Sequence, residues 1–374
     1  MHTTLDAIAT GHPPLGRPQS EAADFMGRIE SLPDAIRKRI PELYERSAIE
    51  YRYSCIPDYI RDDPRDFEFF PPNFELNPPP STSQRNQRYR EAVLPLAEDV
   101  ARRAIAKAGL LPEDITHVVA VSCTGFFAPG IDIALVKRLG LPTTTRRAMI
   151  GFMGCYAAFN GLRVADGFCK AHPGARVLLV CAELCTIHFQ VTDSMEDAVI
   201  NSLFSDGAAA AVLSSRRQED AAGRLAYVDS HSLLHDDSED YMTWDVGDTG
   251  FLMGLSARVP AVIGQNIGPF VDELLDRNEL RRTDVDFWAI HPGGRAIVER
   301  AQEELGLSDE QVADSLEVLR LNGNMSSPTI LFVLERLLAA RAMEGGKADV
   351  PSTALAMAFG PGLTLEGCLL RELS

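Results

Sequence analysis

Five short runs of apolar residues along the chain predict β-strands that are buried on both faces of a sheet. Each run has the length of a strand, and stretches with the period of a helix lie between the runs. Strands that alternate with helices usually belong to parallel crossover units, so the pattern predicts an α/β fold with a mainly parallel sheet between helices. The five runs are Thr116–Ser122, Val177–Cys181, Ala208–Leu213, Phe287–Ile290 and Ala354–Ala358.

The region before these runs predicts a long helix that follows a packed arm. Residues Gln84–Ala108 place apolar side chains on one helical face, and Gly109 is a typical stop signal. Pro95 is expected to kink this helix or to end its first part. The preceding segment 57–80 contains seven prolines, but it also contains four phenylalanines, which flexible linkers rarely carry. We therefore expect segment 57–80 to pack over the first domain.

Three pairs of similar segments indicate an internal repeat. Each pair alone is weak evidence. Together they are stronger, because the three pairs follow in the same order and are separated by nearly the same number of residues. They predict two related α/β halves, residues 1–220 and 221–374, joined by the polar segment 214–223. The pairs are Asp114–Val121 with Asp284–His291, Lys137–Pro142 with Glu303–Ser308, and Val177–Cys181 with Ala354–Ala358.

The composition is that of an ordinary globular protein, with 45% apolar and 24% charged residues among 374. No apolar run approaches the ~18 residues that a membrane span needs. The segment Met1–Ala7 lacks a basic region followed by an apolar stretch, so we expect no secretory signal. Seven cysteines in a long chain suit reduced thiols better than a disulfide framework. Together these features predict a cytoplasmic protein.

Charge and histidine spacing narrow the function classes further. The 36 basic and 53 acidic residues give a formal net charge of −17, which argues against a nucleic-acid-binding protein. The histidines lack the spacing of metal ligands, so we expect no metal site. His231 and His235 are four residues apart, but an acidic loop follows them and no third ligand is evident.

Three residues stand in settings that could support catalysis. Cys155 lies where small residues lead into an apolar helical stretch, and a helix N-terminus favours a thiolate, although most free cysteines are simply buried. His291 ends an apolar run before Gly293, at a strand end where α/β folds place reactive side chains, although a buried or capping histidine fits equally. Asn324 precedes a typical helix start and could be only a turn residue.

The order Cys155, His291, Asn324 is compatible with two mechanisms. One is that of a papain-like cysteine hydrolase, which also runs Cys, His, Asn, but the local motif of those enzymes is missing here. The other is carbon–carbon bond formation on a thioester. In that mechanism the cysteine carries an acyl group while histidine and asparagine donate hydrogen bonds to a developing enolate or oxyanion.

Over nearly its full length the chain resembles the type III polyketide synthases, the chalcone and stilbene synthase family. The likeness rests on six motifs in the family's order: Ala7–Pro14, Gly154–Cys155, Leu203–Ala210, Ala289–Gly294, Gly323–Ser327 and Phe359–Thr364. The resemblance implies a thiolase-like fold, in which two similar α/β halves form a layered αβαβα arrangement, and a homodimer.

The resemblance also implies roles for the three candidate residues. Cys155 would accept a starter acyl group from acyl-CoA as a thioester. His291 would hold Cys155 as a thiolate through an ion pair and, with Asn324, would polarise the thioester carbonyl of malonyl-CoA so that carbon dioxide is lost. No cofactor is implied, because CoA thioesters are the substrates.

Five positions of the chain match pocket positions of the family. Phe204 matches one of two phenylalanines between the CoA tunnel and the cavity, and Met253 aligns with the second. Ala128 stands where plant members have a methionine that reaches into the partner's cavity. Thr124 and Cys185 fall where bacterial long-chain alkylpyrone synthases open a tunnel, although they could also merely pack the core. Small residues enlarge a pocket, and each buried methylene adds ~0.8 kcal/mol, so we expect a long starter.

Further positions are matched by motif. His188 occupies a position that helps to set cyclisation in plant relatives, and Gly293 lies in the motif of the histidine. Gly360 and Pro361 belong to the loop that bounds the cyclisation cavity, or form only a tight turn. Arg46 roughly matches a basic position that contacts CoA, which an acidic protein needs because CoA carries phosphates, although a solvated helix face fits Arg46 nearly as well.

The function implied is that of a homodimeric synthase. It would extend a medium- or long-chain acyl-CoA with malonyl-CoA and release an alkylpyrone or an alkylresorcinol. Within the family, the alternative is a synthase that primes with malonyl-CoA and makes a tetrahydroxynaphthalene or a phloroglucinol-type product. Outside it, the papain-like hydrolase and a non-catalytic acyl-CoA-binding protein remain as alternatives.

Overall fold

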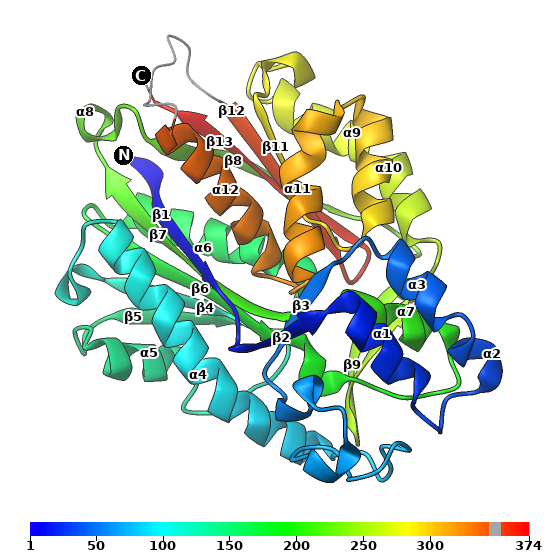
Figure 1. Ribbon diagram of the computed structural model, residues 1–374. Coiled ribbons are helices and arrows are strands. Elements are labelled where there is room, and N and C mark those ends of the chain that lie inside the picture. The colour runs from blue at the N-terminus through cyan, green and yellow to red at the C-terminus, as the bar shows by residue number, and fades with distance from the viewer. Residues whose placement is uncertain (344–352, 374) are drawn as a thin grey trace.

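The computed structural model describes residues 1–343 and 353–373 (Figure 1). Within these residues, nine strands form one sheet in the order β11-β12-β13-β8-β1-β7-β6-β4-β5. Each of the five predicted apolar runs lies in or overlaps a strand of this sheet, so these predictions are confirmed. The strands are β1 (His2–Gly11), β4 (His117–Val121), β5 (Arg146–Ile150), β6 (Arg176–Leu184), β7 (Asp206–Arg216), β8 (Leu225–Leu234), β11 (Phe287–Ile290), β12 (Thr353–Gly360) and β13 (Thr364–Glu372).

The prediction of a mainly parallel sheet is wrong. Among the described residues, three of the eight strand pairings in the sheet are parallel and five are antiparallel. A continuous apolar run reports that both faces of a strand are buried, but it does not report the direction of the strand. The antiparallel pairings arise because β7 and β13 run back beside β6 and β12.

The strand order of the sheet is repeated within the chain. The order β4-β6-β7-β1 and the order β11-β12-β13-β8 match in connection and in direction, with one parallel pairing followed by two antiparallel ones in each. The helices that follow β4 and β11 both end at a left-handed glycine, Gly140 and Gly306. These features support the division at residues 220 and 221, which stays a prediction. The observed connector is shorter than the expected segment 214–223, because β7 extends to Arg216.

Three hydrophobic cores separate five layers (Figure 1). One core lies between the N-terminal strands and an outer layer of α4 and α5, and another lies between the C-terminal strands and an outer layer of α9, α10 and α11. The third core surrounds α6 and α12, which fill the space between the two sets of strands. The αβαβα arrangement that the resemblance implied is therefore confirmed. The helices are α4 (Thr82–Lys107), α5 (Ile131–Leu139), α6 (Ala157–Ala171), α9 (Val259–Asp276), α10 (Arg295–Leu305), α11 (Asp309–Asn322) and α12 (Thr329–Met343).

The long helix and the arm lie where the sequence placed them. Helix α4 is continuous across Pro95, so the expectation that this proline could end its first part is wrong. The arm consists of turns and two short 3₁₀ helices, Pro57–Ile60 and Pro64–Asp66. Phe69 and Phe70 pack against the core beneath α4, which confirms a packed arm rather than a flexible linker.

A group of smaller elements gathers beside one end of the sheet (Figure 1). Packing among α1, α3 and α7, and of α7 against a β-hairpin, encloses the space in front of the strand ends. A short helix, α8 (Gln218–Ala221), lies apart from this group and follows β7. The elements of the group are β2 (Leu15–Pro18), α1 (Gln19–Gly27), α2 (Asp34–Arg37), α3 (Ile40–Arg46), β3 (Tyr51–Ser54), α7 (Met195–Leu203) and the hairpin of β9 (Met242–Gly247) with β10 (Gly250–Leu255).

No helix in the described ranges 1–343 and 353–373 is long and apolar enough to cross a membrane. Within the same ranges, no three side chains of His, Cys, Asp or Glu gather as they would around a metal ion. All seven cysteines lie in these ranges, and each carries a free thiol.

Candidate active site

Cys155 lies in a 3₁₀ turn, Gly154–Tyr156, that leads directly into α6. The sequence predicted this setting at the start of a helix. Gly154 has a φ of +73°, and a Cβ on it would come within 2.5 Å of a ring carbon of Pro361, so the turn needs glycine there. The side chain of Cys155 is buried, with 6% of the residue exposed.

Asn324 is fixed by main-chain pairing with a distant strand end. It forms an isolated parallel bridge with Phe204, and its N–H donates to the carbonyl of Leu203 at 2.9 Å. Its Oδ1 accepts a hydrogen bond from the N–H of Ser326 at 2.8 Å, while its Nδ2 donates to the carbonyl of Gly293 at 3.1 Å. Because these partners fix the orientation of the amide, a second Nδ2 hydrogen remains available to other groups.

His291, Asn324 and Cys155 converge around Gly293. A Cβ on Gly293 would lie 3.7 Å from Nε2 of His291 and 3.9 Å from Nδ2 of Asn324, so both nitrogens border the space over this glycine. Cys155 in turn lies near the side chains of Asn324 and Ser326, which lower the pKa of its thiol. His291 directly follows β11 and is buried, yet neither ring nitrogen has a hydrogen-bond partner among the described residues. An unpaired imidazole and an amide N–H therefore border the space over Gly293, and the amide also lies near the thiol.

Burial changes the protonation of this pair. It raises the pKa of the Cys155 thiol to about 11, although hydrogen bonds from Ser326 and Asn324 lower it in part. Burial also lowers the pKa of His291 to about 3. Taken separately, both shifts favour the neutral forms, a thiol and an imidazole. The thiolate–imidazolium ion pair that the resemblance implies stays a prediction, which the reactivity of Cys155 tests.

This protonation state predicts how Cys155 reacts with iodoacetamide. Only the thiolate is alkylated, and a pKa of about 11 leaves little thiolate at neutral pH. We expect the alkylation rate to rise about tenfold per pH unit through the neutral range, with no plateau there. Mass spectrometry of the Cys155 peptide over a pH series measures this rate. A plateau near neutral pH would instead indicate a preformed ion pair.

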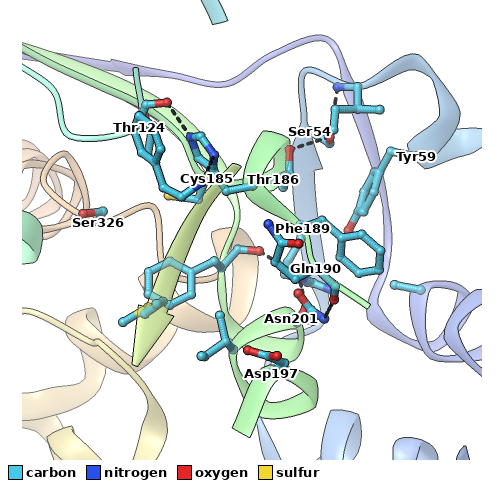
Figure 2. A pocket seen from close by; sticks show the side chains of 18 of the residues that line it. Ser54, Tyr59, Thr124, Cys185, Thr186, Phe189, Gln190, Asp197, Asn201 and Ser326 are labelled. Carbon is cyan, nitrogen blue, oxygen red and sulfur yellow. Dashed lines mark hydrogen bonds between the residues drawn. The ribbon is translucent and has the colours of Figure 1, made fainter. Parts of the chain in front are cut away.

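One cavity extends from Cys155 to the layer formed by α1, α3 and β3 (Figure 2). Six residues that the sequence placed in the pocket line it: Thr124, Cys185, His188, Phe204, Met253 and Pro361. Much of the remaining lining is apolar: Ala22, Phe25, Met26, Ile56, Phe70, Leu76, Phe189 and Ile200. Such a wall suits a flexible hydrocarbon tail.

His188 is held in one neutral tautomer. Its Nε2 lies 2.6 Å from the carbonyl of Thr124, to which it can only donate, and its Nδ1 accepts from the N–H of Phe251 at 3.0 Å. The imidazole stacks on the Phe251 ring with centroids 4.2 Å apart. Burial lowers the pKa of His188 to about 3, which agrees with this neutral form. With both nitrogens engaged, His188 shapes the cavity wall and has no free nitrogen for acid–base chemistry.

Six predicted residues are not part of the cavity lining: His291, Gly293 and Asn324, which lie together as described above, and Ala128, Arg46 and Gly360. Ala128 is exposed on the surface of this chain. Arg46 has a side chain that is 74% exposed and forms an ion pair with Glu42 at 2.7 Å, so its role toward CoA stays a prediction. Gly360 packs behind Cys155, where a Cβ would come within 2.7 Å of the Tyr156 ring.

The sequence reasoning missed a buried carboxylate that organises the site. Glu183 accepts hydrogen bonds from the N–H groups of Cys123 and Thr124 and from the hydroxyls of Thr124 and Ser327 at 2.7 Å. Burial raises its pKa, although these hydrogen bonds oppose the shift. Glu183 thus ties the wall at Thr124 to the loop that carries Ser326. A single charged residue at the end of an otherwise apolar strand was the available signal.

Comparisons with known proteins identify the family. Residues 2–216 match the N-terminal domain of chalcone and stilbene synthases, and residues 229–374 match the C-terminal domain. The chain therefore belongs to the chalcone and stilbene synthase family and is a type III polyketide synthase, an acyltransferase.

Individual relatives share most of the chain. An alpha-pyrone synthesis polyketide synthase-like protein of Mycobacterium tuberculosis is 38% identical over 367 residues, which cover 98% of this chain and 90% of the relative. The crystal structure of PKS-I from the brown alga Ectocarpus siliculosus matches with a TM-score of 0.94 and 40% identity over 99% of this chain and 98% of that chain. A 3,5-dihydroxyphenylacetyl-CoA synthase of Streptomyces toyocaensis is 30% identical over 94% of this chain and 86% of the relative.

Proposed function

We propose that this synthase extends a medium- or long-chain acyl group, held on Cys155, with units from malonyl-CoA and releases an alkylpyrone or an alkylresorcinol. The observation that carries the proposal is the largely apolar cavity that begins at Cys155 and passes Thr124 and Cys185. Both of these residues are small, and both stand on the wall of the cavity (Figure 2). The name of the Mycobacterium tuberculosis relative, which refers to alpha-pyrone synthesis, supports the product class.

In the first step His291 acts as a base toward Cys155. The neutral imidazole takes the thiol proton as the sulfur attacks the acyl-CoA carbonyl, and the proton then passes to the departing CoA thiolate. The thioester bond to CoA breaks and a thioester bond to Cys155 forms. The raised pKa of the buried thiol makes this proton transfer necessary.

In the second step the donors around Gly293 act on malonyl-CoA. Loss of carbon dioxide leaves an enolate whose oxygen accepts hydrogen bonds from the free N–H of Asn324 and from His291. For this His291 must carry a proton on Nε2, the nitrogen that borders the space over Gly293. The enolate carbon attacks the Cys155 thioester, the cysteine leaves as thiolate, and the extended chain returns to it before ring closure.

We further propose that the synthase is a cytoplasmic homodimer that needs no cofactor besides its CoA substrates. Seven free thiols and the net charge of −17 suit a reducing, aqueous compartment. The exposed side chains of Met149 and Phe152, on and after the edge strand β5, support a dimer interface at that edge.

Starter preference tests the proposal. We expect turnover by the purified protein, with labelled malonyl-CoA and starters from acetyl-CoA to stearoyl-CoA, to peak at a long starter. Cys185→Phe should fill the cavity and lower kcat/KM for long starters roughly tenfold or more, because burial of the distal methylenes is lost. Short starters should be affected less. Products are identified by mass spectrometry.

Three other outcomes would change the assignment. Efficient product formation from malonyl-CoA alone, with no gain from long starters, would sink the long-chain proposal and favour a phloroglucinol-type product. Amide cleavage without use of malonyl-CoA would favour the cysteine hydrolase. Binding of acyl-CoA without acylation of Cys155 would indicate a non-catalytic relative.

A further inference from the structure

Two buried arginines stand opposite each other in the small sheet of β2 and β3, which borders the cavity. Arg17 and Arg52 are directly paired in the antiparallel register, and they are only 6% and 4% exposed. Both line the same cavity as Cys155. Like charges directly opposite each other destabilise a strand pair, and burial makes each charge more costly. This arrangement calls for a compensating anion.

Arg52 lacks a protein counter-ion. No carboxylate oxygen of the described residues lies within 4.0 Å of its guanidinium. It donates instead to the side-chain oxygen of Gln19 at 2.6 Å and to the carbonyls of Asn201 and Phe204 at 2.8 and 2.7 Å. Arg17 differs, because it forms ion pairs with Asp62 at 3.1 Å and with Glu21 at 3.5 Å.

Two tyrosines add hydrogen-bond donors beside these arginines. The hydroxyl of Tyr59 is buried and has no hydrogen-bond partner among the described residues. Tyr44 donates to Asn201 only at 3.4 Å, and the Arg52 guanidinium lies 5.6 Å from its ring centroid. Figure 2 shows Tyr59 across the cavity from Ser326, with its hydroxyl directed inward. We call Arg17, Tyr44, Arg52 and Tyr59 the donor cluster.

The nearby carboxylates are already satisfied by other groups. Asp58 accepts hydrogen bonds from three consecutive main-chain N–H groups, those of residues 68 to 70. Asp206 accepts from the N–H of Cys55 and from the N–H and hydroxyl of Thr186. Within the donor cluster, the Arg52 guanidinium thus lacks a carboxylate partner and the Tyr59 hydroxyl lacks any partner among the described residues, and the complement of these two donors is an oxygen anion.

We propose that the donor cluster binds a carboxylate at the far end of the starter, so that the substrate class is an ω-carboxyacyl-CoA. The starter's thioester carbon would lie at Cys155, its methylenes would follow the apolar wall, and its distal carboxylate would accept hydrogen bonds from Arg52 and Tyr59. The assignment rests on the proposed function, because it names the starter of that reaction. Arg17, which lies opposite Arg52 and is paired with Asp62 and Glu21, adds further N–H donors.

The test compares paired starters that differ only at the far end. Dodecanoyl-CoA and dodecanedioyl-CoA, and then hexadecanoyl-CoA and hexadecanedioyl-CoA, are given to the full-length protein with malonyl-CoA. We expect a higher kcat/KM for the dicarboxylic member of at least one pair. Tyr59→Phe should lower the ratio of the two kcat/KM values roughly tenfold, since it removes a hydrogen bond to a charged group.

Two variants separate recognition from folding. Tyr59→Phe should unfold at the same temperature as the wild type or at a higher one, because it removes an unpaired buried hydroxyl. Tyr51→Phe removes a hydroxyl from β3, the strand of Arg52, outside the cavity lining and should leave the ratio unchanged. Arg17→Gln should lower the ratio, because it replaces the guanidinium by an amide with fewer hydrogen-bond donors.

The outcomes distinguish this inference from the proposed function. Products from the methyl-ended starters that exceed those from dicarboxylic starters, with no response of the ratio to Tyr59→Phe, would overturn the carboxylate site and keep the long-chain synthase. An ω-hydroxyacyl-CoA of the same length serves as a third starter. If it is preferred over the methyl-ended and the dicarboxylic starters, the donor cluster binds a neutral oxygen, and the argument from charge is overturned. No product from any of these starters would overturn the proposed function itself.

Discussion

Cys155→Ala should abolish polyketide formation, with a fall in turnover of at least about 10³-fold. The thiol is the group that would carry the growing chain, and no other residue of the site can take its place. Among the cavity cysteines, Cys155 is the one whose turn leads directly into a long α-helix, α6, and the Asn324 amide lowers the pKa of its thiol. The substitution should also eliminate the acyl adduct that mass spectrometry of the intact protein detects after incubation with a starter acyl-CoA.

Cys123 provides the matched control for this substitution. It is also buried, it also lines the cavity, and its thiol donates to Glu183 at 3.1 Å. Burial and the Glu183 carboxylate raise its pKa well above the usual range, which disfavours a thiolate. Cys123→Ala should therefore still form the adduct. An adduct that persists in Cys155→Ala but disappears in Cys123→Ala would show that Cys123, and not Cys155, is the nucleophile.

The predictable part of the fold consists of features that short stretches of sequence determine. Apolar runs located strands such as β6 and β11, and the helix that ends at Gly140 has a counterpart that ends at Gly306. Strand direction was not predictable in this way, because it depends on connections rather than on burial. The central strand β1 was not predicted from its pattern either, although its end lies in a motif of the family.

The site shows the same limit. Cys155, His291 and Asn324 were identified by motif and by their places at strand or helix ends, and the fold brings them together around Gly293. Their protonation could not be predicted, since it depends on how completely the folded chain excludes water. The role of Glu183 could not be predicted either, because its hydrogen-bond donors come from segments that are distant in the sequence.

Asn324→Ala should lower the rate of malonyl-CoA decarboxylation by about 10²–10³-fold, the usual cost of removing one oxyanion donor. Acylation of Cys155 by the starter should fall less, because His291 remains to accept the thiol proton. Release of labelled carbon dioxide and the amount of acyl adduct measure the two steps separately. The contrast between the steps would show that Asn324 acts on the enolate rather than on the nucleophile.

Asn322→Ala is the control that tests whether this loss is chemical or structural. Asn322 lies in the same segment, but its side chain is engaged elsewhere: it accepts a hydrogen bond from His12 at 2.7 Å and donates to the carbonyl of Val318 at 2.8 Å. Its substitution should lower the thermal stability while leaving the ratio of decarboxylation to acylation unchanged. Equal changes of that ratio in both variants would mean that the loop geometry, and not the Asn324 amide, stabilises the enolate. A normal ratio in Asn324→Ala would leave His291 as the sufficient donor, which its unpaired ring nitrogens would permit.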